Sequence, residues 1–120
     1  VQYTLMFYLS PSEFSARTDP NTTAAYWGAF MPYMQAVKDA GIFKGGAGLQ
    51  PPDSATTVRV HNGKRAVQDG PYADTKEQLG GFFIIDVPDL DTALDWAARY
   101  PAGPHGVVEV RPNIAAPASE

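Results

Sequence analysis

The chain has 120 residues, which is the length of one small domain with a single core. It contains no cysteine, so disulfides, thiolate metal sites, iron–sulfur clusters and a cysteine nucleophile are excluded. The formal net charge of −4 argues against nucleic acid or an anionic membrane surface as a partner. No apolar run approaches the roughly 20 residues of a membrane-spanning helix, and we expect a cytoplasmic protein.

The first predicted elements are a strand and a loop. If residues 3–9 form an extended segment, both of its faces are largely apolar, which is typical of a central strand that is buried on both sides. Residues 10–21 are rich in turn-forming residues and predict a loop.

A helix is predicted over residues 23–40, with Asn21 or Thr22 as its N-cap and Gly41 just beyond its end. Pro32 interrupts this pattern, because its ring presses on the carbonyl group four residues earlier, so we expect a kink or two shorter helices. The predicted inner stripe has helical spacing and consists of Trp27, Phe30, Met34 and Val37.

Residues 45–48 read Gly-Gly-Ala-Gly and predict a flexible turn. They follow a helix and precede Pro51-Pro52, whereas phosphate-binding glycines follow a strand and open a helix, so a phosphate loop is excluded. A hairpin is predicted next, with strands at residues 56–61 and 64–69 joined by Asn62-Gly63 in a type I′ turn.

The second half of the chain predicts a two-sided apolar strand over residues 80–87, a helix capped by Asp89 and a last strand over residues 107–111. Residues 1–112 form one domain in this interpretation, and residues 113–120 form a tail.

The predicted fold class is α+β, a ferredoxin-like split βαβ sheet with two helices on one face and an inserted β-hairpin. Two helices can cover only one face of the sheet. The other face should carry two or three of Met6, Tyr8, Phe82 and Ile84. We therefore expect a second copy of the chain to cover it in a symmetric homodimer.

The densest set of functional groups lies in residues 69–77. Asp69 and Glu77 are candidate catalytic bases and Lys76 a candidate electrostatic stabiliser, with Tyr72 and Thr75 as candidate ligand-binding residues. The alternative is ordinary turn chemistry, in which the side chain of Asp69 bonds backbone N–H groups.

Other candidates lie outside this loop. His105, in a Gly-Pro-His-Gly segment, is a possible general base, whereas His61 flanks an exposed turn. Tyr26 and Tyr33 lie seven residues apart on the first helix and are candidates to line a pocket or the dimer seam. The two histidines form no metal-binding motif, so we expect no metal and no cofactor.

Residues 69–82 read DGPYADTKEQLGGF and resemble the signature of the DGPF-type branch of the YCII-related family, with Tyr72 in place of the usual phenylalanine. Flanking segments at residues 48–51, 86–91 and 108–112 agree with the same family. The resemblance implies a ferredoxin-like fold that dimerises into an α+β barrel.

Some YCII-like relatives are similar to muconolactone isomerases and dechlorinating lyases, which use a histidine on the first helix with a nearby aspartate. Here Phe30 stands at the histidine position, although Asp39 matches the aspartate, so this dyad is not implied for the chain. DGPF-type proteins also tend to be encoded beside extracytoplasmic-function sigma factors, which implies a regulatory or accessory role.

The leading hypothesis is a homodimer that binds a small organic molecule in a cleft between residues 69–77 and the first helix. Any catalysis would be cofactor-free proton transfer of the isomerase or lyase type, with Asp69 or Glu77 as base. The alternative is a non-catalytic partner of a sigma factor.

Overall fold

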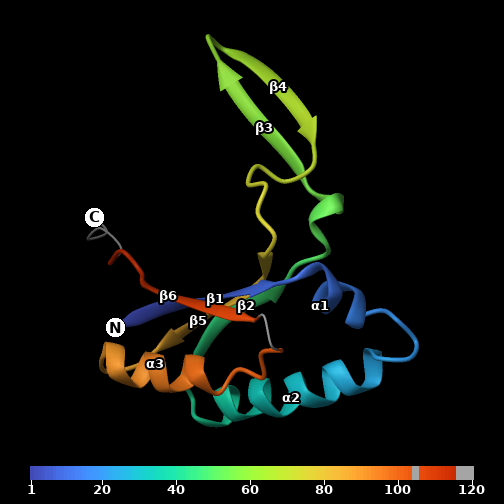
Figure 1. The fold of residues 1–120 in the computed structure, drawn as a ribbon. Helices are drawn as coiled ribbons and strands as arrows, with labels where there is room; N and C mark the ends of the chain where they lie inside the picture. Colours follow the sequence, from blue (N-terminus) through green and yellow to red (C-terminus); the bar gives the residue numbers. More distant parts are fainter. Residues whose placement is uncertain (104–105, 116–120) are drawn as a thin grey trace.

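The structure is a computed structural model that describes residues 1–103 and 106–115. Figure 1 shows the arrangement of its helices and strands. In chain order they are β1 (Gln2–Leu9), α1 (Pro11–Ala16), α2 (Thr23–Asp39), β2 (Phe43–Gly48), the 3-10 helix η1 (Pro52–Ser54), β3 (Thr56–His61), β4 (Lys64–Asp69), β5 (Gln78–Asp86), α3 (Leu90–Ala98) and β6 (Val107–Pro112).

Four strands form an antiparallel sheet in the order β2-β5-β1-β6, and α2 and α3 lie on one face of it (Figure 1). This is the ferredoxin-like α+β arrangement that the sequence predicts. The central strands β1 and β5 are apolar on both faces, as expected, and they pair with each other along their whole length.

The core lies between this sheet and the two helices. Alternate residues of β1 face it, and Leu5 and Leu9 are fully buried there. From α2, Val37 and Tyr33 are buried against β5 residues such as Phe83 and Ile85. Asp89 caps α3 as predicted, because its side chain accepts a hydrogen bond of 2.8 Å from the backbone N–H of Thr92.

The prediction of a flexible turn at residues 45–48 is wrong, because these residues belong to the edge strand β2. Backbone hydrogen bonds to β5 make the strand, and they need no side chains. A Cβ atom on Gly46 would clash with the carbonyl oxygen of Phe82 and lie 3.0 Å from the Phe83 ring. The glycine therefore marks a close approach of two backbones, which is a recognised use of glycine in strands.

The prediction of a loop over residues 10–21 misses the short helix α1. Ser10 accepts a hydrogen bond from the backbone N–H of Glu13, and the Glu13 carboxylate accepts one from the backbone N–H of Ser10. This reciprocal pair is a capping box, which starts a helix at Pro11.

The helix α2 is continuous and is not split in two, with Pro32 inside it. Its N-cap is Thr22, one of the two predicted residues, but the Thr22 hydroxyl donates to the carbonyl of Ala16 instead of capping the helix. The glycine after the helix, Gly41, has a positive φ of 73°, as expected beyond a helix end.

The predicted hairpin is confirmed, with His61 opposite Lys64, Val60 opposite Arg65 and Val58 opposite Val67. Asn62 and Gly63 have φ angles of 51° and 74°, as a type I′ turn requires.

The hairpin forms a sheet of its own, which we call the arm (β3 and β4), and it extends away from the main sheet on the side opposite the helices (Figure 1). The radius of gyration is 16.5 Å, against about 14 Å for a compact domain of this length.

The face of the sheet opposite the helices carries Met6, Tyr8, Phe82 and Ile84, and each of these side chains is half-buried. They are the residues that the sequence assigns to the uncovered face. Of the helices within residues 1–103 and 106–115, none has the length and apolar character that crossing a bilayer requires.

Candidate functional site

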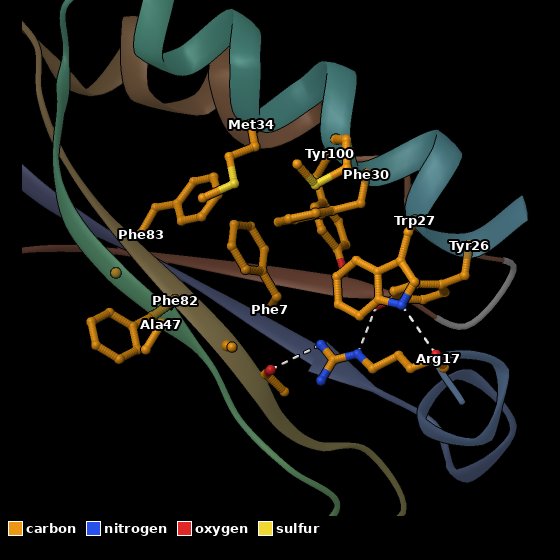
Figure 2. Close-up of a pocket in the computed structure, with 15 residues that line it drawn as sticks. Phe7, Arg17, Tyr26, Trp27, Phe30, Met34, Ala47, Phe82, Phe83 and Tyr100 are labelled. Carbon is orange, nitrogen blue, oxygen red and sulfur yellow. Dashed lines mark hydrogen bonds between the residues drawn. The ribbon is translucent and has the colours of Figure 1, made fainter. Parts of the chain in front are cut away.

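The cavity that we call the main cavity lies between α2 and the sheet (Figure 2); its volume is about 250 Å³, and it is more enclosed than the larger hollows on the surface. Its walls come from the first half of α2, the facing ends of β2 and β5, the middle of β1 and the segment after α3. It is smaller than a typical drug-sized pocket, so a ligand inside it would have one or two rings.

Aromatic rings form the wall on the helix side and the floor. Trp27 and Phe30 of α2 pack edge to face, with ring centroids 5.7 Å apart. Phe7 lies at the floor and stacks on Tyr100, with 4.3 Å between the ring centroids. Figure 2 shows these rings around the cavity, with Phe83 and Met34 closing its far end.

Glycines form the wall on the strand side, which is bare backbone: Gly46, Gly48, Gly80 and Gly81. Gly48 pairs with Gly81 across β2 and β5, and Gly81 pairs with Phe7 across β5 and β1. A Cβ atom on Gly48 would meet no atom within 4 Å, whereas one on Gly80 would lie 2.5 Å from Leu9. The cavity therefore exists because side chains are absent from this part of the sheet.

Gly80 sits at a β-bulge, since Phe7 pairs with Gly81 and Tyr8 pairs with Leu79. Bulges turn backbone groups out of the regular ladder and are common beside functional sites. The carbonyl oxygen of Gly80 here accepts hydrogen bonds from the backbone N–H of Leu49 and from the side chain of Arg17, both at 2.9 Å.

Arg17 is a charged residue of the cavity wall. It follows α1, and its guanidinium donates to the Tyr26 hydroxyl at 3.1 Å and to the carbonyl of Leu49 at 2.7 Å. Its own carbonyl accepts a hydrogen bond of 3.1 Å from the Trp27 indole (Figure 2). These contacts fix both the cation and the indole against the cavity.

Two tyrosines near the cavity remain neutral over the ordinary pH range. Burial, together with the neighbouring Tyr26 hydroxyl, raises the pKa of Tyr100 well above its usual value. Burial also raises the pKa of Tyr33 to about 12, and the Tyr33 hydroxyl donates to the carbonyl of Trp96 at 2.9 Å. Both hydroxyls can therefore act as hydrogen-bond donors rather than as bases.

A sequence model of the YCII-related domain matches residues 2–115. The chain belongs to the YCII-related family. A protein of Rhizobium meliloti (strain 1021), described as uncharacterised, is 50% identical to this chain over 68 residues. That similarity covers 55% of this chain and 55% of the relative, so the YCII-related chain spans about half the length of the curated relative it matches.

The residues of the predicted loop site lie outside the main cavity of this YCII-related protein. Asp69 ends the arm opposite Thr56, and the Tyr72 side chain is 76% exposed with the Arg59 guanidinium 5.1 Å above its ring. Lys76 lines a more open hollow of about 400 Å³ beside α1.

Thr75 and Glu77 belong to a loop closed on itself. The Thr75 hydroxyl donates to the carbonyl of Glu77 at 2.6 Å, and the Gln78 amide donates to the carbonyls of Ala73 and Thr75. The loop leads directly into the glycine-rich start of β5. It therefore precedes a strand that lines the cavity, but none of its own side chains is part of the cavity wall.

The remaining candidates have separate outcomes. Tyr26 lines the cavity, whereas Tyr33 is 5% exposed and belongs to the core. His105 lies outside the described residues. His61 is exposed at the tip of the arm. Within residues 1–103 and 106–115, no group of three or more His, Asp or Glu side chains could hold a metal ion.

Sequence reasoning missed Arg17 and the glycine wall. Arg17 sits in a segment predicted as a loop, and its partners lie 9, 32 and 63 positions away along the chain. A capping box beginning at Ser10 could have identified α1 and hence the position of Arg17. The Gly80-Gly81 pair inside an apolar strand could have indicated a bulge or a close approach.

Proposed function

We propose that the protein binds a small, mainly apolar organic molecule in the cavity between α2 and the sheet. The observation that carries this proposal is a wall of glycine backbone facing a wall of aromatic rings across about 250 Å³. Concave sites with apolar lining and a few polar groups are the usual form of small-molecule sites.

Binding fits the cavity better than turnover does. Among residues 1–103 and 106–115, the titratable side chains in its wall are those of Arg17, Tyr26 and Tyr100, and no carboxylate or imidazole of these residues lines it. Isomerase or lyase chemistry with Asp69 or Glu77 as base would require the 69–77 loop to approach the ligand from outside. A cytoplasmic location and the absence of a cofactor are part of the same proposal.

The experiment is calorimetric titration with 2-naphthalenemethanol, a neutral two-ring probe. The wild-type protein should bind it, and Gly48→Leu should weaken binding by about tenfold or more, because the leucine would occupy the open space beside Gly48. Gly48 pairs with Gly81, so its added side chain would point to the helix side of the sheet.

The matched control is Gly45→Leu in the same strand. Gly45 has open space around it as well, but it pairs with Ile84 and is not part of the cavity wall. Gly45→Leu should bind the probe as the wild type does. Equal binding by the wild type and Gly48→Leu, or no binding by the wild type, would contradict the proposed function.

We further infer that two copies assemble into a homodimer. The uncovered face of the sheet and the arm both lie on the side opposite the helices (Figure 1), and the arm carries exposed valines. A second copy would bury both surfaces at once. A sigma factor or other regulatory protein on the same surfaces is the alternative partner.

A further inference from the structure

The guanidinium of Arg17 has N–H groups that are not used in hydrogen bonds with the residues that the structure describes. Its Nε donates to the Tyr26 hydroxyl at 3.1 Å, one Nη to the carbonyl of Leu49 at 2.7 Å and the other Nη to the carbonyl of Gly80 at 2.9 Å. A guanidinium carries five N–H groups, so two are not engaged by these three contacts. Arg17 is half-buried, and it lines a mainly apolar cavity.

The charge of Arg17 is also not matched by an acidic group. All three acceptors are neutral, and within residues 1–103 and 106–115 no carboxylate oxygen lies within 4.0 Å of the guanidinium. The nearby Glu13 is engaged elsewhere, because its carboxylate accepts from Ser10 and from the backbone N–H of Gly103.

Aromatic rings surround the cation in place of a counter-ion. The Cζ atom lies 5.4 Å from the centroid of Phe14, 5.6 Å from that of Tyr26 and 5.7 Å from that of Trp27. Ring faces attract a cation but do not neutralise it. A partly desolvated positive charge beside an apolar cavity therefore favours an anionic ligand.

The cation is held in place before any ligand arrives. Its three partners come from α2, from the residue after β2 and from the bulge in β5, so the guanidinium cannot turn away without losing contacts to all three. A binding group that is already fixed loses little conformational entropy on binding.

We propose that the ligand of this cavity is a small organic acid whose carboxylate binds Arg17 while its apolar body lies against Trp27 and Phe30. This inference rests on the proposed function and adds the chemical class of the ligand. A carboxylate fits better than a phosphate, because Arg17 is the one cation among the lining residues that the structure describes and would leave a phosphate dianion half-compensated.

The test compares 2-naphthoate with 2-naphthamide, which has the same ring system and no charge. Wild-type protein should bind the acid about tenfold more tightly than the amide, as one or two charge-assisted hydrogen bonds imply. Arg17→Gln should reduce this ratio to about one. Arg17→Lys should keep part of the preference, since lysine retains the positive charge but lacks the planar, two-pronged donor arrangement of a guanidinium.

The control for the loss of a positive charge is Arg59→Gln, because Arg59 lies on the arm and is not part of the cavity wall. It should leave the acid-to-amide ratio unchanged. Thermal unfolding of each variant shows whether the replaced arginine was needed for folding. The comparison of acid and amide affinities in the wild-type protein does not depend on any variant.

The outcomes separate this inference from the proposed function. Equal wild-type affinity for both probes would overturn the organic-acid assignment and leave the binding cavity in place. A preference for the acid that survives in Arg17→Gln would overturn the role of Arg17. Failure of the wild type to bind either probe would overturn both proposals.

Discussion

At the scale of single residues, Gly80 connects the fold to the candidate site. Its bulge removes one residue from the β1–β5 ladder, and its carbonyl oxygen accepts hydrogen bonds from Leu49 and Arg17. A side chain at the same position would meet the fully buried Leu9, so the bulge is packed tightly against Leu9 and is also bonded to the Arg17 cation.

We expect Gly80→Ala to lower the free energy of unfolding by about 1–3 kcal/mol, which is typical of overpacking in a core. The new Cβ would lie 2.5 Å from Leu9 Cδ1 and 3.2 Å from Arg17 Nη2, so both side chains would have to move. Urea denaturation measures the change. Gly48→Ala is the control and should alter stability by less than about 0.5 kcal/mol, because its Cβ would meet nothing within 4 Å. Equal stability of the two variants would contradict the packing argument.

Local patterns predicted the framework of the site but not the site itself. The two-sided strands, the turn at Asn62-Gly63 and the cap at Asp89 each depend on neighbouring residues, and each is confirmed. Arg17 acquires its place through acceptors up to 63 positions away, and such contacts exist only once the sheet has formed. The density of charged residues predicted a site in the 69–77 loop instead, but these residues are charged because the loop is exposed to solvent.

At the scale of elements, β2 and α2 show how tertiary structure overrides local preference. Glycine weakens an isolated strand, yet β2 forms because the edge of β5 offers it a complete set of partners. Proline disfavours the interior of a helix, yet α2 continues through Pro32 because Tyr33 and Val37 are buried against the sheet. Packing of the apolar face thus compensates for the missing hydrogen bond.

Pro32 is exposed, so its effect on stability is separable from packing. We expect Pro32→Ala to raise the free energy of unfolding by about 1 kcal/mol or more, since alanine restores the N–H that can bond the carbonyl of Gly28. Pro51→Ala is the control, because Pro51 is exposed and extended with a φ of −55°. That change should lower stability by up to about 1 kcal/mol, as loss of a loop proline loosens the unfolded chain. A loss of stability in Pro32→Ala, measured by urea denaturation, would be evidence against the argument.

At the scale of the whole molecule, contacts within one chain do not explain how the arm is stabilised. A hairpin of two strands is only marginally stable in water by itself. One face of the arm carries Val58, Val60 and Val67, which are 54%, 71% and 56% exposed. The arm and the uncovered face of the main sheet both lie on the side of the molecule away from the helices (Figure 1). Burial against a second copy would stabilise both.

The homodimer predicts a mass near twice 12.9 kDa in light scattering at micromolar concentration. Val58 and Val67 face each other across the arm, so replacing both with aspartate places two like charges in the proposed interface and should shift the mass toward 12.9 kDa. Ala66→Asp is the control, because Ala66 pairs with Arg59 on the other face of the arm, and this variant should keep the dimer mass. All three positions are exposed in the single chain, so the substitutions leave the buried core unchanged. A wild-type mass near 12.9 kDa would overturn the homodimer and leave the arm as a surface for a different protein partner.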